Sequence, residues 1–284
     1  MKKINLLLII LLLFSVNIVY ADINEELWKA SWKGNIEDVQ SLLDKGADVN
    51  AKTNEYYTAL MLACEKGHTD IVKLLIEKGA DVTIETNTGH TALMDASSGG
   101  YTDIVKLLIE KGANVNVKDY NYGANALMMA CDNGHFEIVK LLIEKGADIN
   151  TKTKDGITAL EMVFEWESLE SINIIKLFIG KGFDINAKLR ENATLLMYAS
   201  ARGYTDIVKL LIDKGADVNA KTKDGVTALI GASQFGYTDI IKLLIDKGAD
   251  VNAKIKDGTT ALKVASEKGY TDTVELLKKA GAEE

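Results

Sequence analysis

One stretch of sequence returns along nearly the whole chain. Its clearest copy is TDIVKLLIDKGADVNAKTKDG, which runs from Thr205 to Gly225. The glycine of its KGAD core recurs at spacings of 33, 33, 34, 36, 33, 33 and 33 residues. A fixed period of that length is typical of stacked supersecondary units, in which each unit contacts only its neighbours. These glycines are Gly46, Gly79, Gly112, Gly146, Gly182, Gly215, Gly248 and Gly281.

Each copy predicts two helices and a polar connection between them. The segment TDIVKLLID is mostly apolar and predicts a long buried helix, with Thr205 as its N-terminal cap. Gly215 ends that helix where a left-handed residue is wanted. The polar residues that follow close on the dipeptide Asp224-Gly225, which suits a tight turn, so this part predicts an extended finger. Thr227 then caps a short helix rich in small residues.

The order of finger, short helix, turn and long helix resembles the ankyrin repeat. The matching motifs are the Gly-His or Gly-Tyr turn, I-V-K-L-L, G-A-D-V-N and a T-x-L start of the short helix, and they extend from about residue 24 to the end. The resemblance implies an all-α repeat solenoid of stacked helix-turn-helix repeats with β-hairpin-like fingers, and protein binding as its activity. The T-x-L motifs begin at Thr58, Thr91, Thr158, Thr194, Thr227 and Thr260.

One departure from the family pattern is clear. The usual T-P-L-H has become T-A-L-M from Thr91 to Met94, and the chain contains no proline. Because a proline in the first turn favours a helix start, we expect weaker starts of the short helices and no change of fold.

The first 21 residues precede the repeats and have the composition of a secretory signal peptide. Lys2 and Lys3 form a basic start, an apolar core follows, and Val19-Tyr20-Ala21 offers a small-residue cleavage signal. We expect cleavage after Ala21. The alternative is an uncleaved anchor helix, although the run is slightly shorter than the roughly 20 residues that span a bilayer. Such a leader is typical of bacteria, so we expect an exported protein, periplasmic or secreted.

The predicted organisation is therefore a signal peptide, residues 1–21, and an ankyrin repeat domain, residues 22–284, of about eight repeats. The two terminal repeats have the character of caps. Leu27, Trp28 and Ala30 are expected to cover the N-terminal end of the stack, with Trp32 nearby, and the alternative for this region is a binding site. We expect a monomer.

The net charge restricts the class of partner. It is −8 for the whole chain, and loss of the leader removes two lysines and no acid, which makes it −10. Nucleic-acid binding needs a basic footprint, so we expect no nucleic-acid partner. We expect no membrane contact after cleavage of the leader either.

Aromatic side chains gather on the fingers of repeats two to four. They are Tyr56 and Tyr57 on the first of these fingers, His90 on the second, and Tyr120 and Tyr122 on the third, which is one residue longer. Exposed aromatic residues are the type that anchors protein interfaces, so these five are candidate partner-binding residues. The alternative is that they pack against their own neighbouring fingers.

The fifth repeat is irregular and carries Glu161, Glu165, Glu167 and Glu170 around Trp166. Paired carboxylates suggest glycoside hydrolysis. Their spacings of four, two and three residues do not direct them into one cavity, so we expect a solvated, lengthened helix instead. Trp166 remains a candidate partner contact.

Basic side chains recur at two finger positions in repeats five to eight. They predict two parallel rows that could meet an acidic partner, with Arg190, Lys223 and Lys256 as candidate contacts and Phe235 as an apolar anchor. The alternative is an ordinary solvated rim. The rows are Lys152, Lys154, Lys188, Arg190, Lys221, Lys223, Lys254 and Lys256.

Signals of catalysis, metal binding or cofactor binding are missing. Cys64 and Cys131 hold equivalent positions two repeats apart, on the order of 20 Å given the usual spacing of packed helices, so we expect free, buried thiols. His68 and His135 lie at turns between helices and His90 lies on a finger, which makes no metal site. The chain lacks a nucleophile elbow, a phosphate loop and a dinucleotide fingerprint. We therefore expect no enzyme, no cofactor and no metal.

The sequence thus favours a non-enzymatic protein–protein interaction module or scaffold. Its concave surface of fingers and short helices would hold another protein, whose identity no motif reveals. The alternative function is a secreted effector or toxin component that acts on host cells, which only the leader favours.

Overall fold

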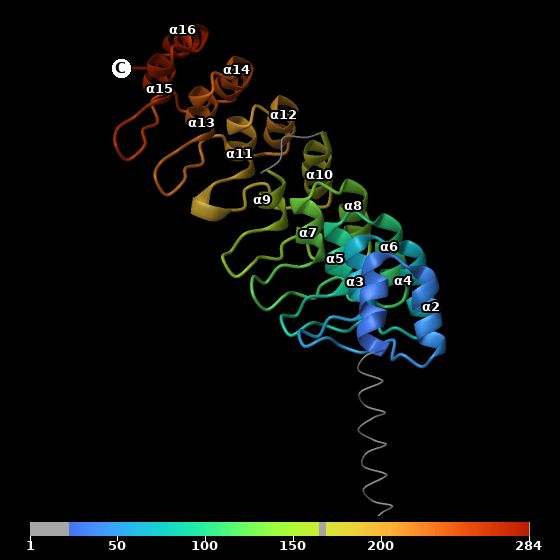
Figure 1. Ribbon diagram of the computed structural model, residues 1–284. Coiled ribbons are helices and arrows are strands. Elements are labelled where there is room, and N and C mark those ends of the chain that lie inside the picture. Colours follow the sequence, from blue (N-terminus) through green and yellow to red (C-terminus); the bar gives the residue numbers. More distant parts are fainter. Residues whose placement is uncertain (1–22, 165–168, 284) are drawn as a thin grey trace, which may run out of the picture. The chain divides into compact units, whose positions relative to one another are not determined.

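The computed structural model describes residues 23–164 and 169–283 (Figure 1). The predicted signal peptide and Trp166 lie outside these residues. Strand pairing among them is confined to single bridges, such as Glu85 with Thr91. The fold is the all-helical repeat solenoid that the period predicts. It divides into two compact units, unit 1 (Met1–Asp148) and unit 2 (Ile149–Glu284).

Each repeat contributes a short helix and a long helix. In unit 1, residues 23–33 are helical and precede α2 (Ile36–Asp44). The pairs that follow are α3 (Ala59–Lys66) with α4 (Thr69–Glu77), α5 (Ala92–Ser98) with α6 (Thr102–Glu110), and α7 (Ala126–Asp132) with α8 (Phe136–Glu144). In unit 2 the pairs are α9 (Ala159–Val163) with α10 (Leu169–Gly180), α11 (Leu195–Ala201) with α12 (Thr205–Asp213), α13 (Ala228–Gln234) with α14 (Thr238–Asp246), and α15 (Ala261–Lys268) with α16 (Thr271–Lys279). A 3-10 turn, η1 (Arg190–Asn192), interrupts the finger that precedes α11.

Helices of the same kind pack side by side within each unit. In unit 1, α5 packs between α3 and α7, and the long helices follow in the order α2, α4, α6 and α8. In unit 2, α13 packs between α11 and α15, while α12 and α14 lie between α10 and α16. The short helices bury small and apolar residues such as Ala63, and the long helices bury a stripe such as Ile71, Val72 and Leu75. The core of each unit therefore lies between its two layers of helices.

Backbone hydrogen bonds close the fingers and join several of them to a neighbouring finger of the same unit. The N–H of Thr222 donates to the carbonyl of Val226 at 3.0 Å, which closes the predicted turn, and Gly225 has a φ of +89°. Between fingers, the N–H of Lys256 donates to the carbonyl of Asp224 at 2.9 Å. Neighbouring fingers consequently lie side by side within a unit (Figure 1).

Threonine caps begin most of the short helices, as the T-x-L motif predicts. The hydroxyl of Thr227, for example, accepts from the N–H of Ile230 at 3.3 Å. Asn125 performs the same role in the fourth repeat, whereas Thr194 makes no such bond and its buried hydroxyl lacks a partner. The threonine caps are Thr58, Thr91, Thr158, Thr227 and Thr260.

The long helices begin differently from the prediction. Thr205 was expected to be the N-terminal cap of α12, but it is the first helical residue and Tyr204 precedes it without a side-chain cap. In most repeats the histidine or tyrosine at this position packs its ring against a glycine of the preceding repeat, whereas Tyr204 stacks on Phe164 of that repeat. A Cβ on Gly203 would lie 2.9 Å from the ring of Tyr237, closer than packed atoms allow. The pairs are His68 on Gly34, Tyr101 on Gly67, His135 on Gly100, Tyr237 on Gly203, and Tyr270 on Gly236.

The fifth repeat has lost this glycine, and an aromatic cluster replaces the contact. Phe164 is buried, and its ring lies 5.1 Å from that of Tyr198 and 6.3 Å from that of Tyr204, measured between centroids. Offset stacking of this kind adds stability beyond the buried area. In the irregular repeat, stacked aromatic rings therefore make the contact with the next repeat that a glycine and a ring make elsewhere.

The sequence predicted that Glu161 lies on a solvated helix, but the residue is buried, with an exposed fraction of 7 %. Its Oε2 accepts from the N–H of Thr158 at 2.8 Å, which completes a capping box, and its Oε1 accepts from the N–H of Arg190 at 2.8 Å. The helix α10 is indeed lengthened, with 12 residues, and its Glu170 is exposed. Glu161 thus ties the start of α9 to the next finger.

The residues predicted to cover the N-terminal end of the stack are packed against the first repeats. Leu27 and Ala30 are buried, and the indole N–H of Trp28 donates to the carbonyl of Ala51 at 3.1 Å. Trp32 remains 47 % exposed, and the ammonium of Lys66 lies 4.9 Å from its ring centroid.

The asparagine that ends the G-A-D-V-N motif bridges one repeat to the next at several interfaces. The amide of Asn186 donates to the carbonyl of Gly215 at 3.2 Å and accepts from the N–H of Asp217 at 2.9 Å. Gly215 has a φ of +90°, as the predicted helix stop requires. The asparagines that make this bridge are Asn50, Asn116, Asn186, Asn219 and Asn252.

Thr83 occupies the equivalent position in the third repeat and does not reach the next repeat. Its hydroxyl donates instead to the carboxylate of Asp81 at 2.7 Å. A cavity of about 170 Å³ lies beside it, lined also by Leu93 and Asn114. The stack of unit 1 therefore contains one interface without its amide bridge.

Thr83→Asn is expected to stabilise the protein. By the spacing of the other bridges, an asparagine there would donate to the carbonyl of Gly112 and accept from the N–H of Asn114, and each such bond contributes about 1 kcal/mol. Urea unfolding should show a higher midpoint. The matched control, Asn219→Thr, breaks an existing bridge and should lower the midpoint. A lower midpoint for Thr83→Asn would show that the amide does not form the bridge.

Glu161→Ala is expected to destabilise unit 2 by about 2 kcal/mol, because it leaves the N–H groups of Thr158 and Arg190 without their acceptor. Amide hydrogen exchange should be faster at Arg190. Glu170→Ala, which removes an exposed glutamate of the same repeat, serves as the control and should leave that exchange rate unchanged. Equal exchange rates in the two variants would contradict the bridging role of Glu161.

Candidate functional site

The predicted site residues divide between the two units. Tyr56, Tyr57, His90, Tyr120 and Tyr122 lie in unit 1, and Arg190, Lys223, Phe235 and Lys256 lie in unit 2. Trp166 is outside the described residues.

Tyr56 has a backbone conformation that is unusual for a large side chain. Its φ is +68°, in the left-handed region, where the equivalent Gly225 has a φ of +89°. A left-handed residue with a Cβ costs roughly 1–2 kcal/mol. The ring is nevertheless 50 % exposed, with the ammonium of Lys52 at 5.5 Å from its centroid. The finger therefore holds an aromatic ring in solvent at a conformational cost.

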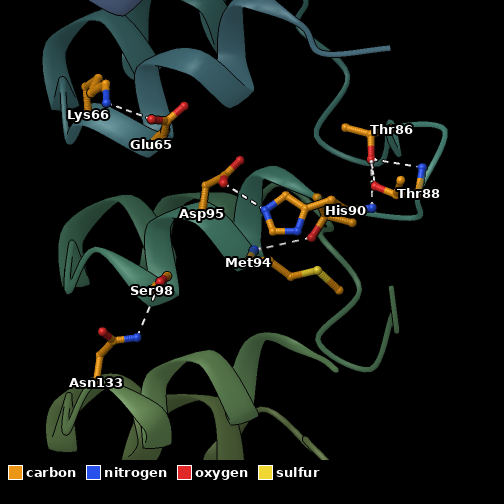
Figure 2. Close-up of polar contacts among 10 residues, drawn as sticks. Glu65, Lys66, Thr86, Thr88, His90, Met94, Asp95, Ser98 and Asn133 are labelled. Atoms are coloured by element: carbon orange, nitrogen blue, oxygen red, sulfur yellow. Dashed lines mark hydrogen bonds and ion pairs between the residues drawn. The ribbon is translucent and has the colours of Figure 1, made fainter. Parts of the chain in front are cut away.

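His90 and Asp95 form a close polar pair at the base of the fingers of unit 1 (Figure 2). Because a carboxylate only accepts, Nε2 of His90 donates to Oδ1 of Asp95, and the two atoms lie 2.8 Å apart. His90 comes from the finger, and Asp95 lies on α5. The second oxygen of Asp95, Oδ2, is buried and has no hydrogen-bond partner. The pair thus leaves half of a buried carboxylate unsatisfied.

Burial and the neighbouring carboxylates shift the pKa values of these groups. Burial raises the pKa of Asp95, and the charge of Glu65 raises it further, whereas the bond to His90 opposes the rise. Burial lowers the pKa of His90, but the bond to Asp95 and the charges of Asp95, Asp119 and Glu65 outweigh it, so that this pKa is raised. The pKa of Tyr57 is also raised, by burial and by the charges of Asp95 and Glu65.

The third finger is held in shape by one buried aspartate. Asp119 is 7 % exposed, and its carboxylate accepts from the N–H groups of Tyr122 and Ala124, both at 2.7 Å. The hydroxyl of Tyr120 donates to Glu85 on the neighbouring finger at 2.6 Å. Tyr122 points away from such contacts and is 69 % exposed. Asp119 therefore presents Tyr122 to solvent on a fixed loop.

The candidate lysines of unit 2 form ion pairs between neighbouring fingers. Lys223 lies 3.4 Å from Glu191, and Lys256 lies 2.7 Å from Asp224. All four side chains are more than half exposed, so each pair contributes only about 0–1 kcal/mol. Such weak pairs are easily exchanged for contacts with a partner. The side chain of Arg190 is exposed on η1.

Phe235 is a rigid apolar group on the surface of unit 2. It is 52 % exposed at the end of α13, and its ring stacks against Tyr237 with centroids 5.9 Å apart. Because Tyr237 also packs on Gly203, the contact between repeats fixes the orientation of Phe235.

The finger and short-helix surfaces of the two units carry opposite charge. In unit 1 these segments, residues 51–66, 84–98 and 117–132, contain six carboxylates and three lysines. In unit 2 the corresponding segments, residues 151–164, 187–202, 220–235 and 253–268, contain six carboxylates and eleven lysines and arginines.

The two cysteines are free and buried, as predicted. Burial raises the pKa of both thiols, which makes them poor nucleophiles. Over residues 23–164 and 169–283, no group of three or more His, Cys, Asp or Glu side chains suits a metal ion. No helix in that part of the chain is long and apolar enough to cross a membrane.

Sequence reasoning did not identify Asp95 or Asp119. Asp95 could have been found, because the equivalent positions in other short helices carry apolar residues such as Leu62 and Met129. The only signal for Asp119 was the extra residue in its finger.

Comparison with known proteins agrees with this architecture. The family model "Ankyrin repeats (3 copies)" matches residues 27–119, 120–188, 164–255 and 196–284. No curated protein matches the chain. Ankyrin repeats are generally protein–protein interaction modules and typically non-enzymatic. Since the matches cover almost all of the repeats, the chain belongs to the ankyrin repeat family.

Proposed function

We propose that this protein is a non-enzymatic scaffold that holds a partner protein on the fingers and short helices of its two units. The observation that carries the proposal is the rigid presentation of exposed aromatic rings. Tyr56 is exposed in spite of a strained backbone, and Tyr122 is exposed on a loop that Asp119 fixes. Nothing in the packing of the repeats requires either ring to be there.

Rigid aromatic residues suit protein recognition for a physical reason. They bury a large area on binding and lose little conformational freedom, because a tyrosine has only two rotatable side-chain torsions. Phe235 in unit 2 has the same character, since its stack with Tyr237 already fixes its ring. These residues therefore have the properties of interface anchors.

The basic surface of unit 2 supports a partner with acidic groups. Lys223 and Lys256 can each leave a weak, exposed ion pair to bind a carboxylate of the partner. Long-range attraction of this kind speeds association more than it strengthens the complex. We therefore expect salt to slow binding to unit 2.

Tyr122→Ala and Phe235→Ala should each weaken partner binding by about 5- to 30-fold, the effect of losing an anchor of 1–2 kcal/mol. The measurement is affinity capture from extracts of the source organism, followed by titration of the captured protein against each variant. Ile36→Ala is the matched control, because Ile36 is 41 % exposed on α2, away from the fingers.

The control should bind like the unaltered chain, and all three variants should keep its melting temperature. Binding that is unchanged in both Tyr122→Ala and Phe235→Ala would rule out these surfaces as the interface.

We also propose that the protein is exported from a bacterial cell and that its leader is removed. The basic start, apolar core and small-residue end of residues 1–21 support this proposal. Export would place the two units in the periplasm or outside the cell. An effector that acts on host cells is the second candidate, and the leader is again its support.

Intact mass and N-terminal sequencing of the protein from its source should show a chain that begins at Asp22. A chain that retains residues 1–21 in the membrane fraction would contradict cleavage. Processed protein in the culture medium would favour the effector, and processed protein in the cell envelope would favour a periplasmic scaffold.

A further inference from the structure

Three lysines at equivalent positions of unit 2 lack the ion pairs that lysines beside them make. The fingers before α11, α13 and α15 contain the same short pattern, which reads AKLR, AKTK and AKIK. The second basic residue of the pattern pairs with a carboxylate in two of these fingers. The first basic residue is exposed in all three, and its side chain forms no ion pair or hydrogen bond among the described residues. These residues form the inner lysine row: Lys188, Lys221 and Lys254.

The backbone holds the inner lysine row on connected fingers that lie side by side (Figure 1). Lys256 donates its backbone N–H to the carbonyl of Asp224 at 2.9 Å, and Lys223 makes the same kind of bond to the finger before it. A Cβ on Gly225 would lie only 2.9 Å from the carbonyl oxygen of Lys254, so these two fingers pack closely. Packed helices of neighbouring repeats lie about 8–10 Å apart, so the row extends over roughly 16–20 Å.

The three lysines share one face of the fingers. Buried and exposed residues alternate within the pattern, since Ala220 and Ala253 are buried whereas Lys221 and Lys254 are exposed. Lys254 also forms an antiparallel bridge with Thr260, so its backbone is extended. Successive side chains of an extended backbone point to opposite faces. The inner lysine row therefore faces solvent, opposite the buried alanines.

Most carboxylates of the same surface are already engaged. The fingers and short helices of unit 2 carry eleven basic residues and six carboxylates. Glu161 is buried and accepts from backbone N–H groups, and Asp257 accepts from the N–H of Thr259 at 2.9 Å. Glu191 and Asp224 pair with lysines of the next finger. An anionic group of a partner can consequently reach the inner lysine row without displacing an existing contact.

Two properties of unit 2 favour an acidic polypeptide over a nucleic acid as that anion. Each lysine of the row is followed three residues later by a carboxylate, namely Glu191, Asp224 and Asp257. A nucleic-acid strand carries a phosphate about every 3.4 Å, so it would bring phosphates close to these carboxylates. Unit 2 also has 19 lysines and arginines against 20 aspartates and glutamates, which is not the basic excess that nucleic-acid binding needs. A polypeptide can place its carboxylates at the lysines alone.

We propose that the inner lysine row binds an extended acidic segment of the partner protein, with a carboxylate at each lysine. This inference rests on the proposed protein-binding function and specifies the partner chemistry for unit 2. Extended backbone advances about 3.3 Å per residue, so about six residues cover the row. Each exposed ion pair is weak, and the affinity for the segment comes from the three pairs together.

The direct test measures the binding of an acetylated octaglutamate amide to the full chain at pH 7.5 and low salt. Replacement of the whole inner lysine row by glutamine should weaken binding about 10-fold, which corresponds to 1.4 kcal/mol. The matched control replaces three exposed lysines at equivalent positions of α10, α12 and α14, and it should change binding less than 2-fold. The control substitutions are Lys176→Gln, Lys209→Gln and Lys242→Gln.

Equal weakening by the two triple variants would overturn the proposal, because both lose three charges and the effect would then follow net charge alone. All six lysines are exposed, so both variants should keep the melting temperature of the unaltered chain.

An eight-residue oligothymidylate is the second probe. It should bind more weakly than octaglutamate, because its phosphates meet the finger carboxylates. Binding as tight as that of octaglutamate, and lost with the inner lysine row, would overturn the acidic polypeptide as the ligand.

Backbone amide signals in NMR spectra show where octaglutamate binds. The probe should shift the signals of Lys188, Lys221 and Lys254 more than those of Lys209 and Lys242 on the long helices. Shifts that are larger on the long helices would place the probe elsewhere and overturn the site.

The captured partner separates this inference from the proposed function. If the inner-row variant binds the partner as well as the unaltered chain does, while Phe235→Ala does not, the scaffold function stands and the lysine site is wrong. If the unaltered chain captures no partner, the scaffold function fails, and the octaglutamate result still decides whether the row binds acidic segments.

Discussion

The contact between an aromatic or imidazole ring and the glycine of the preceding repeat underlies the architecture of both units. In a solenoid each repeat contacts only its neighbours, so the stability is the sum of the repeats and of the interfaces between neighbours. The ring of Tyr237 on Gly203 and the amide bridge of Asn186 to Gly215 lie at different places of the repeat. Together they fix the distance between neighbouring repeats at two points, so each finger is held in a defined position beside the next.

One repeat lacks the glycine that receives the ring, and another lacks the bridging asparagine. The chain compensates for the first loss and not for the second. In the fifth repeat, which lacks the glycine, Phe164 stacks against Tyr198 and Tyr204, and Glu161 adds a bond to the finger of Arg190. The loss of the glycine contact is therefore compensated by new contacts. Thr83 replaces an asparagine without any such compensation, and a cavity remains beside it. A repeat protein tolerates the second outcome because the loss is confined to one interface.

The sequence predicted most of the structural features that are set within a single repeat. It predicted few of the contacts that join two repeats. The period, the caps such as Thr227, the helix stop at Gly215 and the buried thiols are local or periodic features, and they were correct. The cap at Thr205 was wrong because Tyr204 makes a contact with the preceding repeat instead. Glu161 was taken for a solvated residue because its acceptor role involves Arg190, which is 29 residues away. Asp95 and Asp119 were missed because each works through the fold of a finger.

The stability of the repeated interfaces explains how unit 1 can contain unfavourable groups. Tyr56 in a left-handed conformation and the unpaired oxygen of Asp95 each cost free energy that no local contact returns. Neither residue contributes to the ring-on-glycine contacts or the amide bridges, so neither weakens the interfaces between neighbouring repeats. Tyr56 lies on a finger and is half exposed, so a partner can offset its cost by covering the ring.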